Sequence, residues 1–161
     1  MQCQPDSGDV MIEKEELSSI IPHRDRMLLL GRVVDYNLEE MNVEAEYRIT
    51  EDCILFDPAA KGVPAWAGFE LMAQAFCALC GIRDKKMGVP SKNGVILAVS
   101  QLQTGLPFFG AGSILCIKVK ETERMDSVCF LEGEISLDGQ RVLEGKLTVM
   151  EVDSDDQNRL N

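Results

Sequence analysis

Residues 62–82 read GVPAWAGFELMAQAFCALCGI, an apolar run that contains a single carboxylate, Glu70. Removing an ionised carboxylate from water is costly unless the group is paired or its pKa rises. A glutamate kept in such a segment therefore needs a reason, and catalysis is one such reason. Glu70 is the first candidate functional residue of the chain.

The spacing of the run predicts a helix. Pro64 lies in the expected first turn and Gly81 at the expected stop. Apolar residues recur at i, i+3, i+4 and i+7 and predict one buried stripe, formed by Phe69, Met72, Ala73, Phe76, Leu79 and Cys80. Glu70 falls beside this stripe, in a row with Gln74 and Cys77, so we expect it to border the core.

A membrane span is the alternative interpretation of this helix, because its length is close to the roughly 20 apolar residues that cross a bilayer. Glu70, Gln74, Pro64 and the glycines make the segment a poor span, and alternating patterns on both sides of it are typical of a sheet protein. The sequence favours a buried core helix and no association with a membrane.

The 161 residues are enough for one domain with a sizeable core, and no linker composition divides them. We expect a single domain over residues 1–161, with residues 1–10 and 153–161 as flexible tails. The net charge of −11 argues against a nucleic-acid partner or an anionic membrane surface. Residues 1–10 lack the basic start and apolar stretch of a secretory signal, which predicts a cytoplasmic protein.

Six cysteines include one C-x-x-C pair, Cys77 and Cys80, late in the predicted helix. With no second pair and one histidine in the chain, the spacing is poor for a structural zinc site or a thioredoxin-like motif. We expect reduced core thiols and no metal.

The predicted elements are two strands, the helix, and then four strands. They comprise a short helix at 12–20, strands at 27–35 and 41–50, the apolar helix, a charged loop at 84–93, and strands at 95–102, 114–121, 128–137 and 142–152. Asp138-Gly139 is a hairpin signal between the last two strands. A helix this apolar needs cover on every side, so we predict an α+β fold in which an antiparallel sheet wraps around it. An open sheet edge then favours dimerisation.

Three stretches resemble the hotdog-fold 3-hydroxyacyl-acyl-carrier-protein dehydratases of the FabZ/FabA type. IIPHRDRMLLLGRV at 20–33 is similar to the family's L-P-H-R-x-P-F-L-L-V-D-R-V, and VPAWAGFELMAQ at 63–74 to its M-P-G-V-L-x-x-E-A-M-A-Q. LPFFGAG at 106–112 is a weaker match to the later P-V-x-P-G-D turn. The resemblance implies a hotdog fold with the sheet around one central helix.

The chain departs from FabZ just before the helix. There the family has G-H-F-P, whose histidine is catalytic, whereas this chain has Leu55-Phe56-Asp57-Pro58. P-H-R, F-D-P and the helix motif together resemble the ApeP-like branch, dehydratases associated with aryl polyene synthesis. That resemblance implies dehydration of 3-hydroxyacyl thioesters to trans-2-enoyl thioesters, with no cofactor.

Such an elimination needs a base for the α-proton, an acid for the departing hydroxyl and a dipole for the enolate oxygen. Glu70 fits the acid, because burial beside Trp66 and Phe69 should raise its pKa. The alternative is a glutamate satisfied by Gln74 or by a dimer partner. His23 is the chain's one imidazole and the candidate base, with a structural cap as the alternative.

Asp57 is the reserve catalytic candidate, because it lies where the usual histidine would be; an ordinary turn aspartate is the alternative. Backbone amides around Ala65 and Trp66, at the start of the helix, are candidates for holding the thioester oxygen. Phe56 is a further candidate for contact with the substrate.

The expected partners are an acyl-carrier-protein or coenzyme A thioester, a second copy of the chain in a homodimer or higher oligomer, and possibly a second hotdog subunit. Arg24 and Arg26 are the candidate carrier-binding residues, because they lie next to His23 in the sequence. The alternative is the basic cluster after the helix, formed by Arg83, Lys85, Lys86 and Lys92. Two other functions stay open: a hotdog thioesterase that uses the helix carboxylate to activate water, and a non-catalytic acyl-binding subunit.

Overall fold

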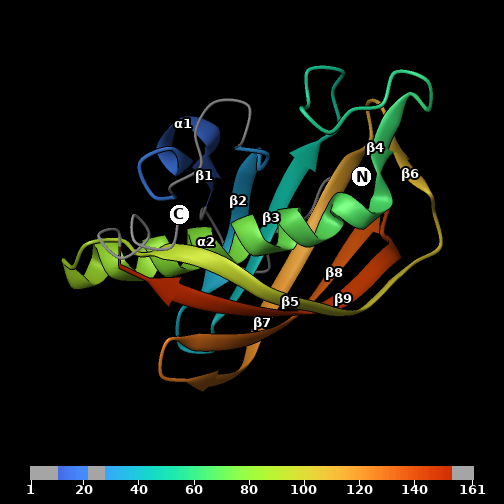
Figure 1. The fold of residues 1–161 in the computed structure, drawn as a ribbon. Helices are drawn as coiled ribbons and strands as arrows, with labels where there is room; N and C mark the ends of the chain where they lie inside the picture. Colours follow the sequence, from blue (N-terminus) through green and yellow to red (C-terminus); the bar gives the residue numbers. More distant parts are fainter. Residues whose placement is uncertain (1–10, 22–27, 154–161) are drawn as a thin grey trace.

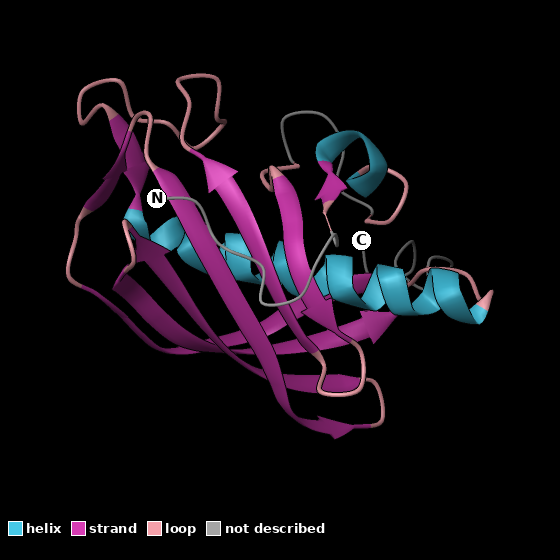
Figure 2. Cartoon of the chain, turned by 180° about the vertical axis from the view of Figure 1, so that it is seen from behind, coloured by secondary structure: helices cyan, strands magenta, loops and turns pink. Residues whose placement is uncertain are grey.

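A computed structural model describes residues 11–21 and 28–153 of the chain (Figure 1). The sequence predictions for the two tails, except Asp153, for the first residue of the strand at 27–35 and for His23, Arg24 and Arg26 fall outside these residues. Within them, one long helix lies across a curved antiparallel sheet, and Figure 2 shows the same arrangement from behind. This is the α+β architecture that the sequence predicts.

The main sheet has seven strands. In spatial order they are β1 (Ile12–Glu13), β2 (Arg32–Asn37), β3 (Asn42–Arg48), β7 (Ile114–Met125), β8 (Val128–Leu137), β9 (Gln140–Val152) and β5 (Asn93–Thr104). All the pairings are antiparallel. The four strands predicted after the helix are confirmed as β5, β7, β8 and β9.

The Asp138-Gly139 turn is also confirmed. Both residues have positive φ, 52° and 77°, which is the backbone geometry that joins two twisted strands in a two-residue hairpin. Aspartate is one of the few residues other than glycine that tolerate the left-handed region, and Gly139 adopts it without steric cost.

Two predictions near the N-terminus are wrong in detail. The helix predicted at 12–20 is only the short α1 (Lys14–Leu17), preceded by β1. The strand predicted from residue 27 begins at Arg32 instead, because buried Leu28, Leu29 and Leu30 pack into the core without joining the sheet. A second sheet of two short strands, β4 (Gly62–Pro64) and β6 (Phe108–Gly110), was not predicted.

The central helix begins and ends later than predicted. A 3₁₀ turn, η2 (Ala65–Ala67), leads into α2 (Gly68–Met87), and the helix ends at Gly88, which has a φ of 67°. The predicted stop at Gly81 is therefore wrong, and residues 84–87 are helical. Gly81 has a packing role, since a Cβ there would lie 2.5 Å from the carbonyl oxygen of Ile20.

The sheet covers α2 on most of its surface. The predicted stripe is buried except for Phe69, which is partly buried. Gly133, paired with Gly145 across β8 and β9, lets Met72 approach the sheet, because a Cβ on Gly133 would collide with the Met72 sulfur. Ala65–Met87 is long and apolar enough to cross a membrane, but 78% of its most apolar window is buried inside the fold. It is the core helix of this sheet.

An ion cluster joins the C-terminal half of α2 to the sheet. Glu151 in β9 accepts from Arg83 of α2 and from Arg124 of β7, each at 2.8 Å, and Arg124 also holds Glu121 with two hydrogen bonds of 2.9 and 3.2 Å. Burial by itself raises the pKa of Glu151, but the bonds from Arg124 and Arg83 outweigh it and lower the pKa to about 2.

Gly81→Ala tests the close approach of α2 to Ile20. Alanine is the better helix former by about 1 kcal/mol, yet we expect the free energy of unfolding to fall by about 1–3 kcal/mol because the new methyl group meets main-chain atoms. Urea unfolding measures the change. Gly105→Ala is the matched control, since a Cβ there meets open space. Equal stability of the two variants would contradict the packing argument.

Glu151→Gln tests the ion cluster. The pKa of Glu151 is depressed in the folded chain, so its stabilisation is present above the ordinary pKa of 4.5 and is lost as pH falls toward about 2. We expect the wild-type free energy of unfolding to drop by up to about 3 kcal/mol more than that of the variant across this window. Denaturant titrations at each pH measure it. Glu132 is exposed, so Glu132→Gln should keep the wild-type dependence of the free energy of unfolding on pH. The same dependence in Glu151→Gln would contradict a stabilising role for the ionised Glu151.

Candidate active site

Glu70 lies in the first turn of α2 and is partly buried. One turn along the helix, Gln74 is fully buried and its Nε2 donates a hydrogen bond to Glu70 Oε1 at 3.1 Å. The predicted row of Glu70 and Gln74 at the border of the core is present. The positive end of the helix favours the ionised carboxylate at this position.

Gln74 connects Glu70 to the segment that precedes β2. Its Oε1 accepts a hydrogen bond of 2.9 Å from the backbone N–H of Leu29. Leu29 is buried, and it lies six residues after His23 in the sequence. His23, Arg24 and Arg26 themselves lie outside the described residues.

Trp66 was expected to help bury Glu70, but its ring is largely exposed. Its side chain is 55% exposed, and its ring stacks on that of Phe69 with centroids 6.3 Å apart. Phe69 packs on the core. The pair therefore presents an aromatic surface to solvent one turn before Glu70, and Trp66 does not bury the carboxylate in the part of the chain that the structure describes.

The expectation of a free amide at Ala65 is wrong. The N–H of Ala65 donates to the carbonyl oxygen of Pro107 at 3.0 Å. This bond continues the β4–β6 pairing by one residue, and that small sheet was not foreseen from the sequence. Ala65 is buried and supports the start of η2.

The side chain of Asp57 stabilises a turn. Its Oδ1 accepts from the backbone N–H groups of Ala59 and Ala60 at 2.8 and 3.2 Å, and its main chain pairs with Gly62. This is the turn role that the sequence left as the alternative to catalysis. Phe56, directly before it, is partly buried against the core.

Four cysteines, Cys53, Cys77, Cys80 and Cys129, are free thiols as expected. The expectation is wrong for Cys116, which is disulfide-bonded. Burial raises the pKa of Cys77 to about 12 and also raises that of Cys80. Because thiolates are the reactive and metal-binding form, the C-x-x-C pair is poorly suited to redox or metal chemistry. The described residues contain no group of three or more metal-ligating side chains.

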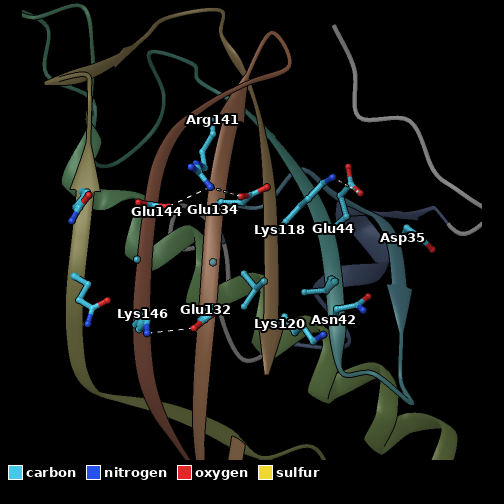
Figure 3. Close-up of a pocket in the computed structure, with 16 residues that line it drawn as sticks. Asp35, Asn42, Glu44, Lys118, Lys120, Glu132, Glu134, Arg141, Glu144 and Lys146 are labelled. Carbon is cyan, nitrogen blue, oxygen red and sulfur yellow. Dashed lines mark ion pairs between the residues drawn. The ribbon is translucent and has the colours of Figure 1, made fainter. Parts of the chain in front are cut away.

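A groove with a volume of about 530 Å³ lies elsewhere, on the face of the sheet away from α2 (Figure 3). Charged side chains of both signs line it and pair across the strands. Lys146 lies 3.4 Å from Glu132, Lys118 lies 3.8 Å from Glu44, and Arg141 bridges two glutamates. None of the predicted site residues that the structure describes lines this groove, and exposed pairs of this kind contribute little energy.

Comparison with known proteins agrees with the sequence motifs. The model of the ApeP-like family, described as ApeP dehydratase, matches residues 15–161. The 3-hydroxyacyl-[acyl-carrier-protein] dehydratases FabZ of Francisella tularensis, in subspecies novicida and tularensis, are 23% identical over 155 residues, which cover 89% of this chain and 94% of the relative.

Solved structures show the same fold. The dehydratase heterocomplex ApeI:P from Xenorhabdus doucetiae matches with a TM-score of 0.82 and 23% identity, over 89% of this chain and 95% of that one. A hypothetical thioesterase with coenzyme A from Streptococcus pneumoniae matches with a TM-score of 0.56 and 15% identity, over 75% and 84%. At these identities the structures establish the hotdog fold, and the family match identifies the class of enzyme.

Proposed function

The chain belongs to the ApeP-like dehydratase family, and from this premise we propose that it removes water from 3-hydroxyacyl thioesters bound to an acyl carrier protein. The product is the trans-2-enoyl thioester. The observation that carries the proposal is a partly buried carboxylate, Glu70, at the start of the core helix and held by buried Gln74. The names of the FabZ relatives support the carrier-bound substrate.

His23 is the proposed base and Glu70 the proposed acid. His23 takes the α-proton, the C–O bond at the β-carbon breaks, and the hydroxyl leaves as water with the proton of Glu70. The positive end of α2 favours the negative charge that develops on the thioester oxygen. The hydrogen bond from the Leu29 N–H to Gln74 supports the role of His23 as base, because it places Leu29, six residues after His23 in the sequence, near Glu70.

Aromatic residues at the start of α2 and in the loop before β4 are the proposed substrate contacts. The exposed ring of Trp66, stacked on Phe69, and the partly buried Phe56 offer apolar surface to an acyl chain. With its N–H bonded to Pro107, Ala65 contributes to the wall of the site and not to the binding of an oxyanion. Arg24 and Arg26 are the proposed contacts of the acidic carrier protein.

We also propose that the site is completed by a second hotdog chain, either another copy or a related subunit, in the cytoplasm. Strand β5 is the long edge of the main sheet, paired on one side only by β9, and its Leu97 and Val99 are exposed. It contacts both α2 and η2, so a strand added at this edge would lie beside Trp66. The heterocomplex of the Xenorhabdus relative supports a second subunit.

Replacement of Leu97 and Val99 by lysine tests the assembly. Two charges on the edge should prevent strand pairing, so the double variant should run as a monomer where the wild type runs as a dimer or larger complex. Sedimentation velocity measures the change. Met125→Lys is the control, because Met125 is also exposed but lies in β7, with two strands between it and β5. A monomeric wild type would refute a homo-oligomer.

Glu70→Gln and His23→Ala test the chemistry. Each should lower the hydration of a crotonyl thioester by a factor of about 10² or more, because each removes a proton-transfer group. Circular dichroism and the unfolding midpoint check that the fold is intact. Asp57→Asn should retain most of the activity. Near wild-type turnover in both variants would refute the dehydratase mechanism, and release of free thiol by the wild type would indicate a thioesterase.

A further inference from the structure

Side chains of the described strands form a row across the outer face of the sheet, the face away from α2 that Figure 3 shows. The register of β1, β2, β3, β7 and β8 places directly opposite one another Glu13, Arg32, Glu46, Cys116 and Ser136. Residues paired in this way point to the same face of a sheet. Cys116 lies between buried Leu115 and Ile117, so its side chain is on the face opposite the core.

The start of this row is covered more than charged pairs farther along the sheet. The side chains of Arg32 and Glu46 are 20% and 11% exposed, whereas those of Lys146 and Glu132 are 48% and 57% exposed. Met11, which directly precedes β1, accepts a hydrogen bond of 3.4 Å on its sulfur from Nη1 of Arg32. The chain that leads into β1 therefore lies beside the outer face, at the end of the row that contains Cys116.

The states of the cysteines leave one pairing within the chain. The sequence contains six cysteines. Among the described residues, the free thiols are Cys53, Cys77, Cys80 and Cys129. Cys116 is disulfide-bonded. The one other cysteine of the sequence is Cys3, which lies outside the described residues.

From this count and from the row, we infer that Cys116 and Cys3 form a reversible disulfide that fastens the N-terminal segment to the outer face of the sheet at β7. The distance allows the bond. Three strand spacings separate β1 from β7, which is about 14 Å. The chain from Cys3 to Glu13 can extend over about 33 Å. The inference does not depend on the proposed dehydration.

The bond forms by thiol–disulfide exchange with a small-molecule disulfide such as oxidised glutathione. The thiolate of one cysteine attacks the glutathione disulfide and releases one glutathione, and the thiolate of the second cysteine then displaces the other. Two protein thiols are oxidised, one glutathione disulfide is reduced to two thiols, and the two protons pass to those thiols. A disulfide in a cytoplasmic protein is usually transient and redox-sensing. The site therefore responds to oxidation of the thiol pool.

The other thiols are poor competitors for this bond. Burial raises the pKa of Cys77 to about 12 and that of Cys129 to about 11, so little of either is present as the reactive thiolate at neutral pH. Cys53 is buried, out of reach of a dissolved disulfide. Cys116, on the outer face of a strand, has no core packed over it.

Peptide mapping tests the pairing. The protein is equilibrated with oxidised glutathione, alkylated without reduction and digested with trypsin. We expect residues 1–14 to be linked to residues 93–118, because each stretch ends at its first lysine or arginine. Dithiothreitol should separate the two peptides and restore the mass of two hydrogen atoms. Recovery of Cys116 as a free thiol or as a mixed disulfide with glutathione would overturn the inference, and so would a bond to a second chain.

The thermal midpoint is a second readout. A disulfide between residues 3 and 116 restrains the unfolded chain, so the oxidised wild type should unfold about 5–10 °C above the reduced form. Cys3→Ser and Cys116→Ser should each abolish this difference. Cys53→Ser is the matched control, because Cys53 is a free thiol, and it should keep the difference even if its own midpoint is lower. A difference that persists in Cys116→Ser would overturn the inference.

Discussion

The whole structure depends on the need to cover α2. A 20-residue helix that is apolar on most of its surface has no face to turn to water, so the sheet must curve around it. Small residues make the contact close, since Gly133 admits Met72 and Gly81 admits the main chain of Ile20. At the far end, the ion cluster around Glu151 joins the helix to β7 and β9.

The same constraint explains where polar chemistry can occur along the helix. Gln74 is buried in the midst of apolar neighbours, which is tolerable because both ends of its amide are hydrogen-bonded. Glu70 lies at the first turn, where the helix emerges and a carboxylate is favoured by the helix dipole. The candidate acid is thus partly buried, held by a buried amide, and one turn after the exposed Trp66.

The cover that the described residues give to the helix and sheet is incomplete at β5. That strand runs along α2 and ends the sheet with exposed Leu97 and Val99, near the turn that carries Trp66. A sheet edge and an aromatic surface exposed at the same place are expected where another chain docks. The charged groove on the opposite face differs, because most of the charged side chains that line it are paired with one another.

The sequence by itself determined the core helix, the four strands after it, the turn at Asp138-Gly139 and the candidate acid Glu70, because periodicity, turn chemistry and an isolated carboxylate are local signals. Tertiary structure decided the rest. Gly81 was mistaken for a stop because a close approach to Ile20 leaves no local trace, and the Ala65 amide is occupied because β4 meets β6, a strand far along the sequence. The orientation of the Gln74 amide likewise depends on Leu29, a partner that only folding brings within 2.9 Å.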